Sequence, residues 1–301
     1  MFTTSTGRLH PMWGFVVSTV FSVLAFLVAS YAAGAIAGDR VLLLEAIFRP
    51  LLALLLIALF VWMLTAADHV EGHYFAALGL PRAKGWLKQF TLGCLFAFAL
   101  AVLAVVPIEI WGHTSTRFLH SVHTLPRFGA VLLSLLAGAL AEELVFRGYP
   151  FQHLEQGIGA SGAIAVFSVM FGAVHLANPG ASLWGLVNTI LIGVLLSISY
   201  LRTRALWLPW GIHFGWNFAL GALFGLPVSG LRLFNVVVRT TVSGPTWVTG
   251  GSYGVEASAT AVVIVLAGIV VVWKLPLAHL AQPGMPLPET EHRDSFSGIQ
   301  G

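Results

Sequence analysis

The chain consists largely of apolar stretches of about 20 residues, separated by short connections. A helix of this length spans the hydrocarbon core of a bilayer, because each residue adds about 1.5 Å. Of the 301 residues, 57% are hydrophobic and 9% are charged, whereas a soluble domain carries about 25% charged residues. The sequence therefore predicts a polytopic membrane protein of the all-α class, with about eight transmembrane helices around a membrane-embedded polar cavity.

Hydropathy places the expected spans, because each is a long run with few charges. They are residues 13–37, 41–65, 87–108, 128–146, 162–177, 183–201, 205–225 and 257–273. Residues 1–282 are thus expected to form a single integral-membrane domain. Residues 283–301 are polar and contain Pro and Gly, so we expect a disordered C-terminal tail.

The distribution of Lys and Arg predicts the orientation. With the N-terminus inside, nine basic residues fall in inside connections and five in outside ones. Because basic residues are enriched on the cytoplasmic side, we expect both termini in the cytoplasm. The expected location is a bacterial-type cell membrane. The net charge is only +3 and lies in the connections, so we expect no nucleic-acid partner. The partner that composition implies is the lipid bilayer.

Three charged residues interrupt one of the most apolar runs, in "LLSLLAGALAEELVFRGYP". Glu143 and Arg147 are four apart, so on a helix they share a face and can pair. Glu142 is rotated by about 100° from Glu143 around the helix, so Arg147 is less well placed to pair with it. We expect Arg147 to neutralise the charge of Glu143, and Glu142 to face in another direction. The alternative is a network of all three that only locks the helix near the membrane edge.

Two further expected spans carry polar groups. "FGAVH" ends at His175, and "HFGWN" runs from His213 to Asn217, again four apart. Alone, His175 reads best as a histidine bonded to a backbone carbonyl, and the second pair as a polar contact between helices. Taken together with Glu142, these groups on three apolar segments predict a functional site in one hydrated cavity.

Such a cavity suits the hydrolysis of a carbonyl compound. A carboxylate and a histidine can hold and deprotonate a water molecule, and a second histidine and an asparagine can donate to the developing oxyanion. Two other interpretations remain open on spacing. Glu142, His175 and His213 offer a His₂Glu ligand set for zinc, although the sequence holds no HExxH. The same groups could also relay protons in a proton-coupled transporter.

The order and spacing of these motifs resemble those of a known family. "EELVFR" fits E-E-x-x-x-R, "FGAVH" fits F-x-x-x-H, and "HFGWN" fits H-x-x-x-N. This pattern is similar to the CAAX-processing and bacteriocin-processing membrane endopeptidases, also called the type II CAAX prenyl endopeptidase or abortive-infection family. The resemblance implies an eight-helix fold and a glutamate-dependent peptidase that needs no metal or other cofactor. It also implies roles for four residues by motif position: Glu142 as the base, His175 as a partner in holding the water, and His213 and Asn217 as the oxyanion site.

The resemblance further implies that Glu143 and Arg147 support Glu142. Some relatives remove the last three residues of prenylated CAAX proteins, whereas others are implicated in peptide maturation, immunity or scaffolding. The expected substrate is therefore a membrane-associated peptide, of the prenylated CAAX type or of the signal or bacteriocin type. A non-catalytic immunity or scaffold protein is the further alternative.

Overall fold

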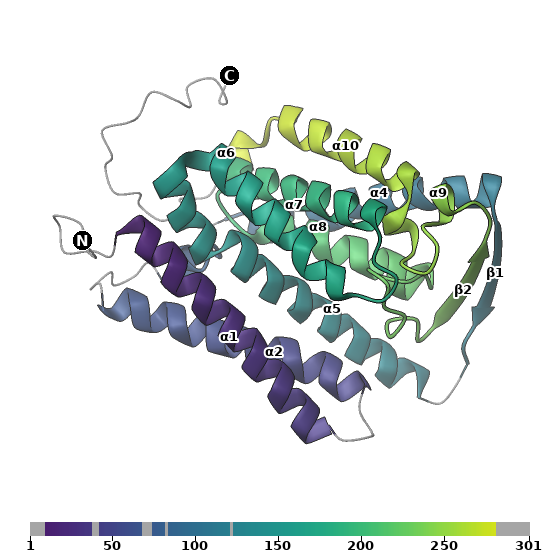
Figure 1. Ribbon diagram of the computed structural model, residues 1–301, viewed down its shortest axis with the longest axis horizontal. Helices are drawn as coiled ribbons and strands as arrows, with labels where there is room; N and C mark the ends of the chain where they lie inside the picture. The colour runs from purple at the N-terminus through teal and green to yellow at the C-terminus, as the bar shows by residue number, and fades with distance from the viewer. Residues whose placement is uncertain (1–9, 38–41, 68–73, 82–83, 121–122, 281–301) are drawn as a thin grey trace.

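The computed structural model describes residues 10–37, 42–67, 74–81, 84–120 and 123–280 and is mostly helical. Its long helices lie side by side along the longest axis of the molecule (Figure 1). They are α1 (Pro11–Ala37), α2 (Leu42–Ala67), α4 (Trp86–Trp111), α5 (Thr124–Arg147), α6 (Tyr149–Val174), α7 (Leu183–Thr203), α8 (Trp207–Phe218) and α10 (Ala259–Lys274). Short helices are α3 (Tyr74–Ala77) and α9 (Thr246–Thr249), with 3₁₀ turns at His175–Ala177, Val255–Ala257 and Leu277–Leu280. The expected C-terminal tail, 283–301, lies outside the described residues.

A helix is present in each of the eight predicted stretches. Within the described residues, however, the segments whose length and composition would let them cross a membrane number four: Pro11–Ala32, Trp86–Trp111, Thr124–Ala177 and Leu183–Thr203. Two shorter apolar helices are Pro50–Trp62 and Ala259–Lys274. The helical class is therefore confirmed, whereas the count of eight spans is not. The predicted cytoplasmic termini also lie outside the described residues and stay a prediction.

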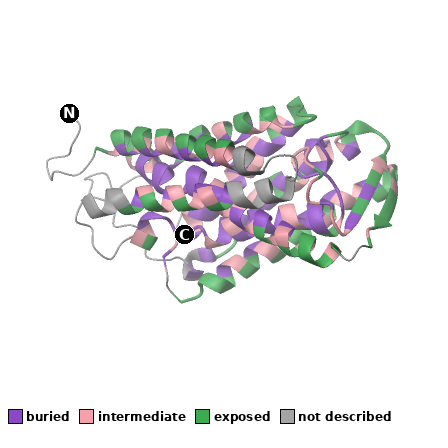
Figure 2. Ribbon diagram, turned by 90° about the horizontal axis from the view of Figure 1, so that it is seen from below, coloured by how far each residue is buried: buried purple, intermediate pink, exposed green. Residues whose placement is uncertain are grey.

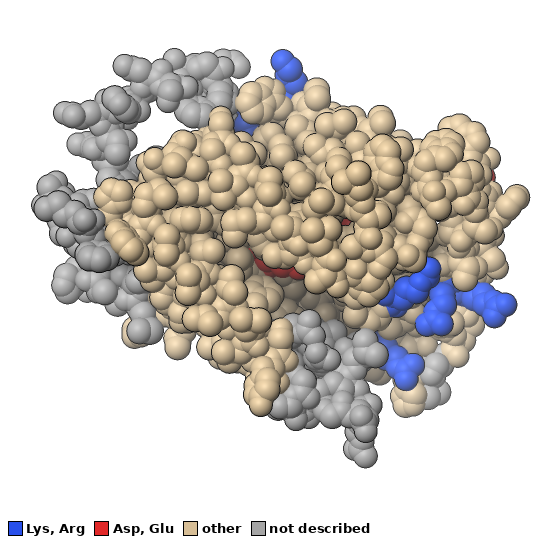
Figure 3. Space-filling model, viewed as in Figure 1, with Lys and Arg blue, Asp and Glu red and all other residues tan. Residues whose placement is uncertain are grey.

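The outer faces of the bundle are apolar. Leu27 on α1, Leu95 on α4 and Val263 on α10 are 61%, 61% and 66% exposed. Exposed residues follow the outer sides of the helices, and buried residues face the interior (Figure 2). The face in Figure 3 is almost free of charge, with basic side chains at its edges and acidic atoms inside a recess. Such a surface suits contact with lipid, because apolar side chains favour leaving water.

A two-stranded antiparallel sheet lies at one end of the bundle, which the prediction of spans did not include. Strand β1 (His113–Phe118) pairs with β2 (Val238–Ser243), with Thr116 opposite Thr240. Thr240 anchors the sheet, because its amide donates to Gly225 O at 2.9 Å and its hydroxyl to Phe224 O at 2.6 Å. The sheet thus ties the segment after α8 to the segment after α4.

Helices α5 and α6 form a hairpin around Gly148. A Cβ atom on Gly148 would lie 2.3 Å from Leu144 O, so the turn requires glycine. Helix α6 is interrupted at Gly159, where φ is 80° and ψ is 167°, a conformation open to glycine and strained for other residues. His175 follows the end of α6 in a 3₁₀ turn. The chain thereby brings His175 to the cavity that Glu142 of α5 also lines.

Small residues let α4 and α8 pack closely. A Cβ on Gly93 would lie 2.5 Å from Leu208 O, and one on Gly211 would lie 2.2 Å from Phe90 O. A Cβ on Gly215 would likewise approach α4 to 2.8 Å. Small residues allow this approach of helix backbones in membrane proteins. Because α8 also carries the motif "HFGWN", these glycines set the depth of that motif in the bundle.

We expect Gly211→Ala to lower the stability of the protein by about 1–3 kcal/mol, because the added methyl group overpacks the α4–α8 contact. Gly129→Ala on α5 is the matched control, since its added Cβ would meet nothing within 4 Å. The control should gain about 0.5–1 kcal/mol from helix propensity. Thermal melting of both variants in detergent measures the difference. Equal melting temperatures for the two variants would contradict this account of the packing.

Candidate active site

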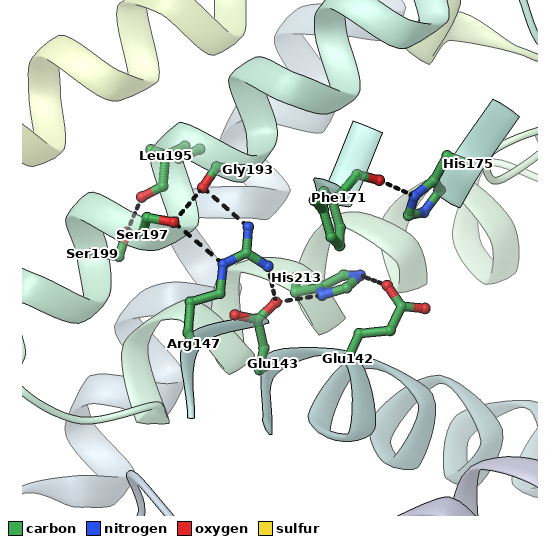
Figure 4. A network of polar contacts seen from close by, with 10 residues as sticks. All are labelled: Glu142, Glu143, Arg147, Phe171, His175, Gly193, Leu195, Ser197, Ser199 and His213. Carbon is green, nitrogen blue, oxygen red and sulfur yellow. Dashed lines mark hydrogen bonds and ion pairs between the residues drawn. The ribbon is translucent and has the colours of Figure 1, made fainter. Parts of the chain in front are cut away.

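A buried ion pair lies at the C-terminal end of α5. Arg147 Nη1 lies 3.3 Å from Glu143 Oε1, and both side chains are fully buried (Figure 4). Arg147 also donates to Gly193 O at 3.0 Å, and its guanidinium lies 4.6 Å from the ring centroid of Phe171. The pair that the i, i+4 spacing predicts is therefore present. It connects α5 to α6 and α7, because its other contacts come from these helices.

His213 lies between two carboxylates. Its Nδ1 lies 2.8 Å from Glu143 Oε1, and its Nε2 lies 3.8 Å from Glu142 Oε2 (Figure 4). Glu143 in its ionised form accepts only, so Nδ1 carries the proton of the shorter contact. The second nitrogen, Nε2, consequently faces Glu142. His213 can donate through Nε2 only when both ring nitrogens are protonated.

Glu142 has a different environment from Glu143. Its side chain is 33% exposed, compared with 0% for Glu143. Its Oε2 atom is buried and makes no hydrogen bond to the described groups. The two neighbouring glutamates are thus distinguished as the helix geometry predicts: one is held by Arg147 and His213, and the other opens toward the interior cavity.

His175 is oriented by its own helix. Its Nδ1 lies 2.7 Å from Phe171 O, and its ring stands 4.7 Å from the ring of Phe171. The backbone-carbonyl contact considered for this histidine is therefore present. It does not oppose a role in the site, because a proton on Nδ1 leaves Nε2 as an acceptor.

A cavity of about 580 Å³ receives the predicted side chains. Glu142, His175, His213 and Asn217 all line it, from α5, the end of α6, and α8. The structure thus brings these four residues together, and the buried Glu143–Arg147 pair lies behind them. Most of the remaining lining is apolar, with residues from α1, α4, α7 and α10. The catalytic roles of Glu142, His175, His213 and Asn217 stay predictions.

One acidic residue of the cavity was not anticipated. Glu256 lies in the 3₁₀ turn before α10, is 3% exposed and lines the same cavity. Burial raises its pKa, and the N–H groups of Ser229 and Trp216 oppose this rise. Burial also raises the pKa of Tyr253, and the nearby Glu256 raises it further. Hydropathy places Glu256 at the boundary between a loop and a span, where a charge carries no signal of a site.

The zinc interpretation depends on how closely its three candidate ligands approach one another. Among the described residues, no group of three or more His, Cys, Asp or Glu side chains is arranged to hold a metal ion. Glu142, His175 and His213 are all described, and they line one cavity without forming such a group. The metal-free reaction stays a proposal to be tested.

The comparisons with known proteins agree with the motifs. No curated protein sequence and no solved structure matches the chain. Residues 124–219 match the family model described as type II CAAX prenyl endopeptidase Rce1-like. This segment contains α5, α6, α7 and α8, and it carries every residue of the three motifs. The resemblance to the type II CAAX prenyl endopeptidases is therefore confirmed over residues 124–219, about a third of the chain.

Proposed function

We propose that the protein is a membrane-embedded peptidase that hydrolyses a peptide bond of a membrane-associated substrate. This proposal rests on one observation: two adjacent glutamates have different environments. Glu143 is held by Arg147 and His213 in the interior, whereas Glu142 opens into a cavity with His175 and Asn217. Neighbouring carboxylates in unlike environments are typical of acid–base catalysis.

In this mechanism, Glu142 and Nε2 of His175 hold the attacking water. Glu142 takes a proton from it, and the oxygen attacks the carbonyl carbon of the scissile bond. His213, protonated on both nitrogens, and the carboxamide of Asn217 donate to the resulting oxyanion. Glu142 then returns the proton to the leaving amine as the tetrahedral intermediate collapses. No Ser or Cys nucleophile and no cofactor is required.

The substrate in this proposal is a peptide that reaches the cavity from the bilayer. The mainly apolar cavity suits a lipid-linked or hydrophobic peptide, since burial of apolar surface favours binding. The family match makes a prenylated CAAX peptide the first probe. A signal or bacteriocin-type peptide is the second. The proposed partners of the protein are therefore the peptide substrate and the lipid bilayer.

The first prediction from this mechanism tests the base with an internally quenched, farnesylated CAAX peptide in detergent micelles. The purified protein should cut it, and Glu142→Gln should slow cleavage by about 10²–10⁴-fold, because the general base is lost. Glu143→Gln should instead destabilise the fold by about 3–5 kcal/mol, because it leaves Arg147 buried without its partner. Cleavage rates per folded molecule and melting temperatures separate the two effects.

Detergent removes any ion gradient, so cleavage there also distinguishes a peptidase from a proton-coupled transporter. A folded Glu142→Gln variant with the parent rate would reject Glu142 as the base. If neither the CAAX peptide nor a hydrophobic signal-type peptide is cut, the proposed peptidase function is wrong.

The second prediction concerns metal. Because Glu142 and His175 activate the water in this proposal, a chelator should leave the cleavage rate unchanged. Elemental analysis of the purified protein, before and after chelation, gives the metal content in parallel. Stoichiometric zinc that disappears together with activity in His175→Ala would instead support the zinc interpretation.

The third prediction tests the oxyanion site. Loss of one oxyanion donor costs about 2.7–4 kcal/mol, so Asn217→Ala should lower kcat by about 10²–10³ with KM little changed. Asn217→Asp should be slower still, because an ionised carboxylate repels the oxyanion and cannot donate to it. The measurement is kcat per folded molecule, with folding checked by thermal melting. A folded Asn217→Asp variant at the parent kcat would exclude this role for Asn217.

A further inference from the structure

Glu256 reaches the catalytic cavity from a part of the chain that the family match does not cover. Its Oε1 accepts a hydrogen bond from Trp216 Nε1 at 2.9 Å, and its Oε2 accepts one from the amide of Ser229. Both donors are neutral, and His175 is a titratable neighbour that also favours the charged carboxylate. A buried carboxylate is costly without such hydrogen bonds, so these two contacts hold it in place.

The first contact joins Glu256 to the motif on α8. Trp216 lies between His213 and Asn217 in the sequence and is 6% exposed. Its indole is fixed at one end by the carboxylate. A hold on this indole restrains the turn of α8 that also carries Asn217, because Trp216 and Asn217 are consecutive residues of that helix.

The second contact joins Glu256 to a tight turn in the cavity wall. Val228 and Leu231 exchange backbone hydrogen bonds of 2.9 and 2.8 Å around Ser229 and Gly230. Ser229 has φ 46° and Gly230 has φ 83°, as in the type I′ turns that favour Gly and Asn. Ser229 therefore occupies a conformation that costs a non-glycine residue free energy. The bond from its amide to Glu256 helps to keep the turn in this form.

The same turn is held on both sides. The amide of Gly230 donates to Tyr253 O at 2.9 Å, and a Cβ on Gly230 would lie 2.0 Å from Pro179 O. Pro179 follows His175 by four residues. The turn is thus packed between the segment that follows His175 and the segment that precedes Glu256. Ser229 and Leu231 line the cavity, so the position of the turn shapes the space left for a substrate.

The chemistry of the two contacts favours glutamate over glutamine. A donor N–H points at each oxygen of Glu256. A carboxamide can accept only through its oxygen, and its NH₂ group would face the second donor. Either the indole or the turn would then lose its partner. The site therefore uses both oxygens of a carboxylate.

We propose that Glu256 is a positioning residue of the hydrolytic site: it locks the Trp216 indole and the 228–231 turn together, and so fixes Asn217 opposite the bound peptide. This inference rests on the proposed peptidase function. Glu256 acts through its neighbours, so its loss changes the rate of the chemical step more than the binding of substrate.

The test uses the full-length protein and the farnesylated CAAX peptide. Glu256→Gln should lower kcat by up to about 100-fold, the loss that follows a misplacement of catalytic groups by about 1 Å, with KM close to the parent value. Trp216→Phe keeps an aromatic ring but removes the indole donor, and it should also lower kcat. The double variant should lose less than the product of the two single losses, because Trp216→Phe removes one of the two contacts that Glu256→Gln disturbs. Glu109→Gln is the matched control, since it removes an exposed carboxylate outside the cavity, and it should leave kcat unchanged.

A folded Glu256→Gln variant with the parent kcat overturns the proposal, as does a loss of melting temperature without a change in kcat per folded molecule. If Glu256→Gln does not fold, Trp216→Phe decides: a folded variant at the parent kcat rejects the coupling. Glu142→Gln is measured in the same assay. Activity retained there rejects the peptidase mechanism itself, whereas an inactive Glu142→Gln beside a fully active Glu256→Gln rejects only the positioning role.

Discussion

The buried pair of Glu143 and Arg147 is the interaction on which the rest of the site depends. Two charges without access to water are costly unless each finds a partner and hydrogen bonds. Here the arginine meets Glu143, Gly193 O and the face of Phe171, so one contact set joins α5, α6 and α7. The same carboxylate also binds Nδ1 of His213, which brings in α8. One ion pair therefore fixes the relative positions of the helices that carry the motifs.

The cost of this pair has a direct consequence for Glu142. With Glu143 occupied by Arg147 and His213, the preceding residue, Glu142, points about 100° away and is left to the cavity. Close packing completes the arrangement, because Gly93, Gly211 and their neighbours let α8 approach α4. A bulkier residue there would push His213 away from Glu143. The ion pair thus determines which glutamate is left to face the cavity, and packing places the residues around it.

Local patterns predicted the helical class and the Glu143–Arg147 pair, because both depend on residues close in the sequence. The convergence of the four cavity residues followed from a weaker argument, the cost of polar groups in apolar segments, and the structure places all four on one cavity. Two features could not be predicted. The sheet pairs segments more than 100 residues apart, and the contact of Glu256 with Trp216 depends on how the loop before α10 folds back. Neither leaves a periodic signal in the sequence.

The position of Glu256 shows how this site is built from two kinds of contact. The motif residues are held by a charged pair inside the helix bundle, where solvent cannot screen it. The wall opposite is held by neutral donors around a second carboxylate, from loops that join the helix ends. Hydrogen bonds to loops are easier to open than a fully buried ion pair. The 228–231 turn therefore depends on the contacts of Glu256 more than the motif helices do, because those helices have an ion pair of their own.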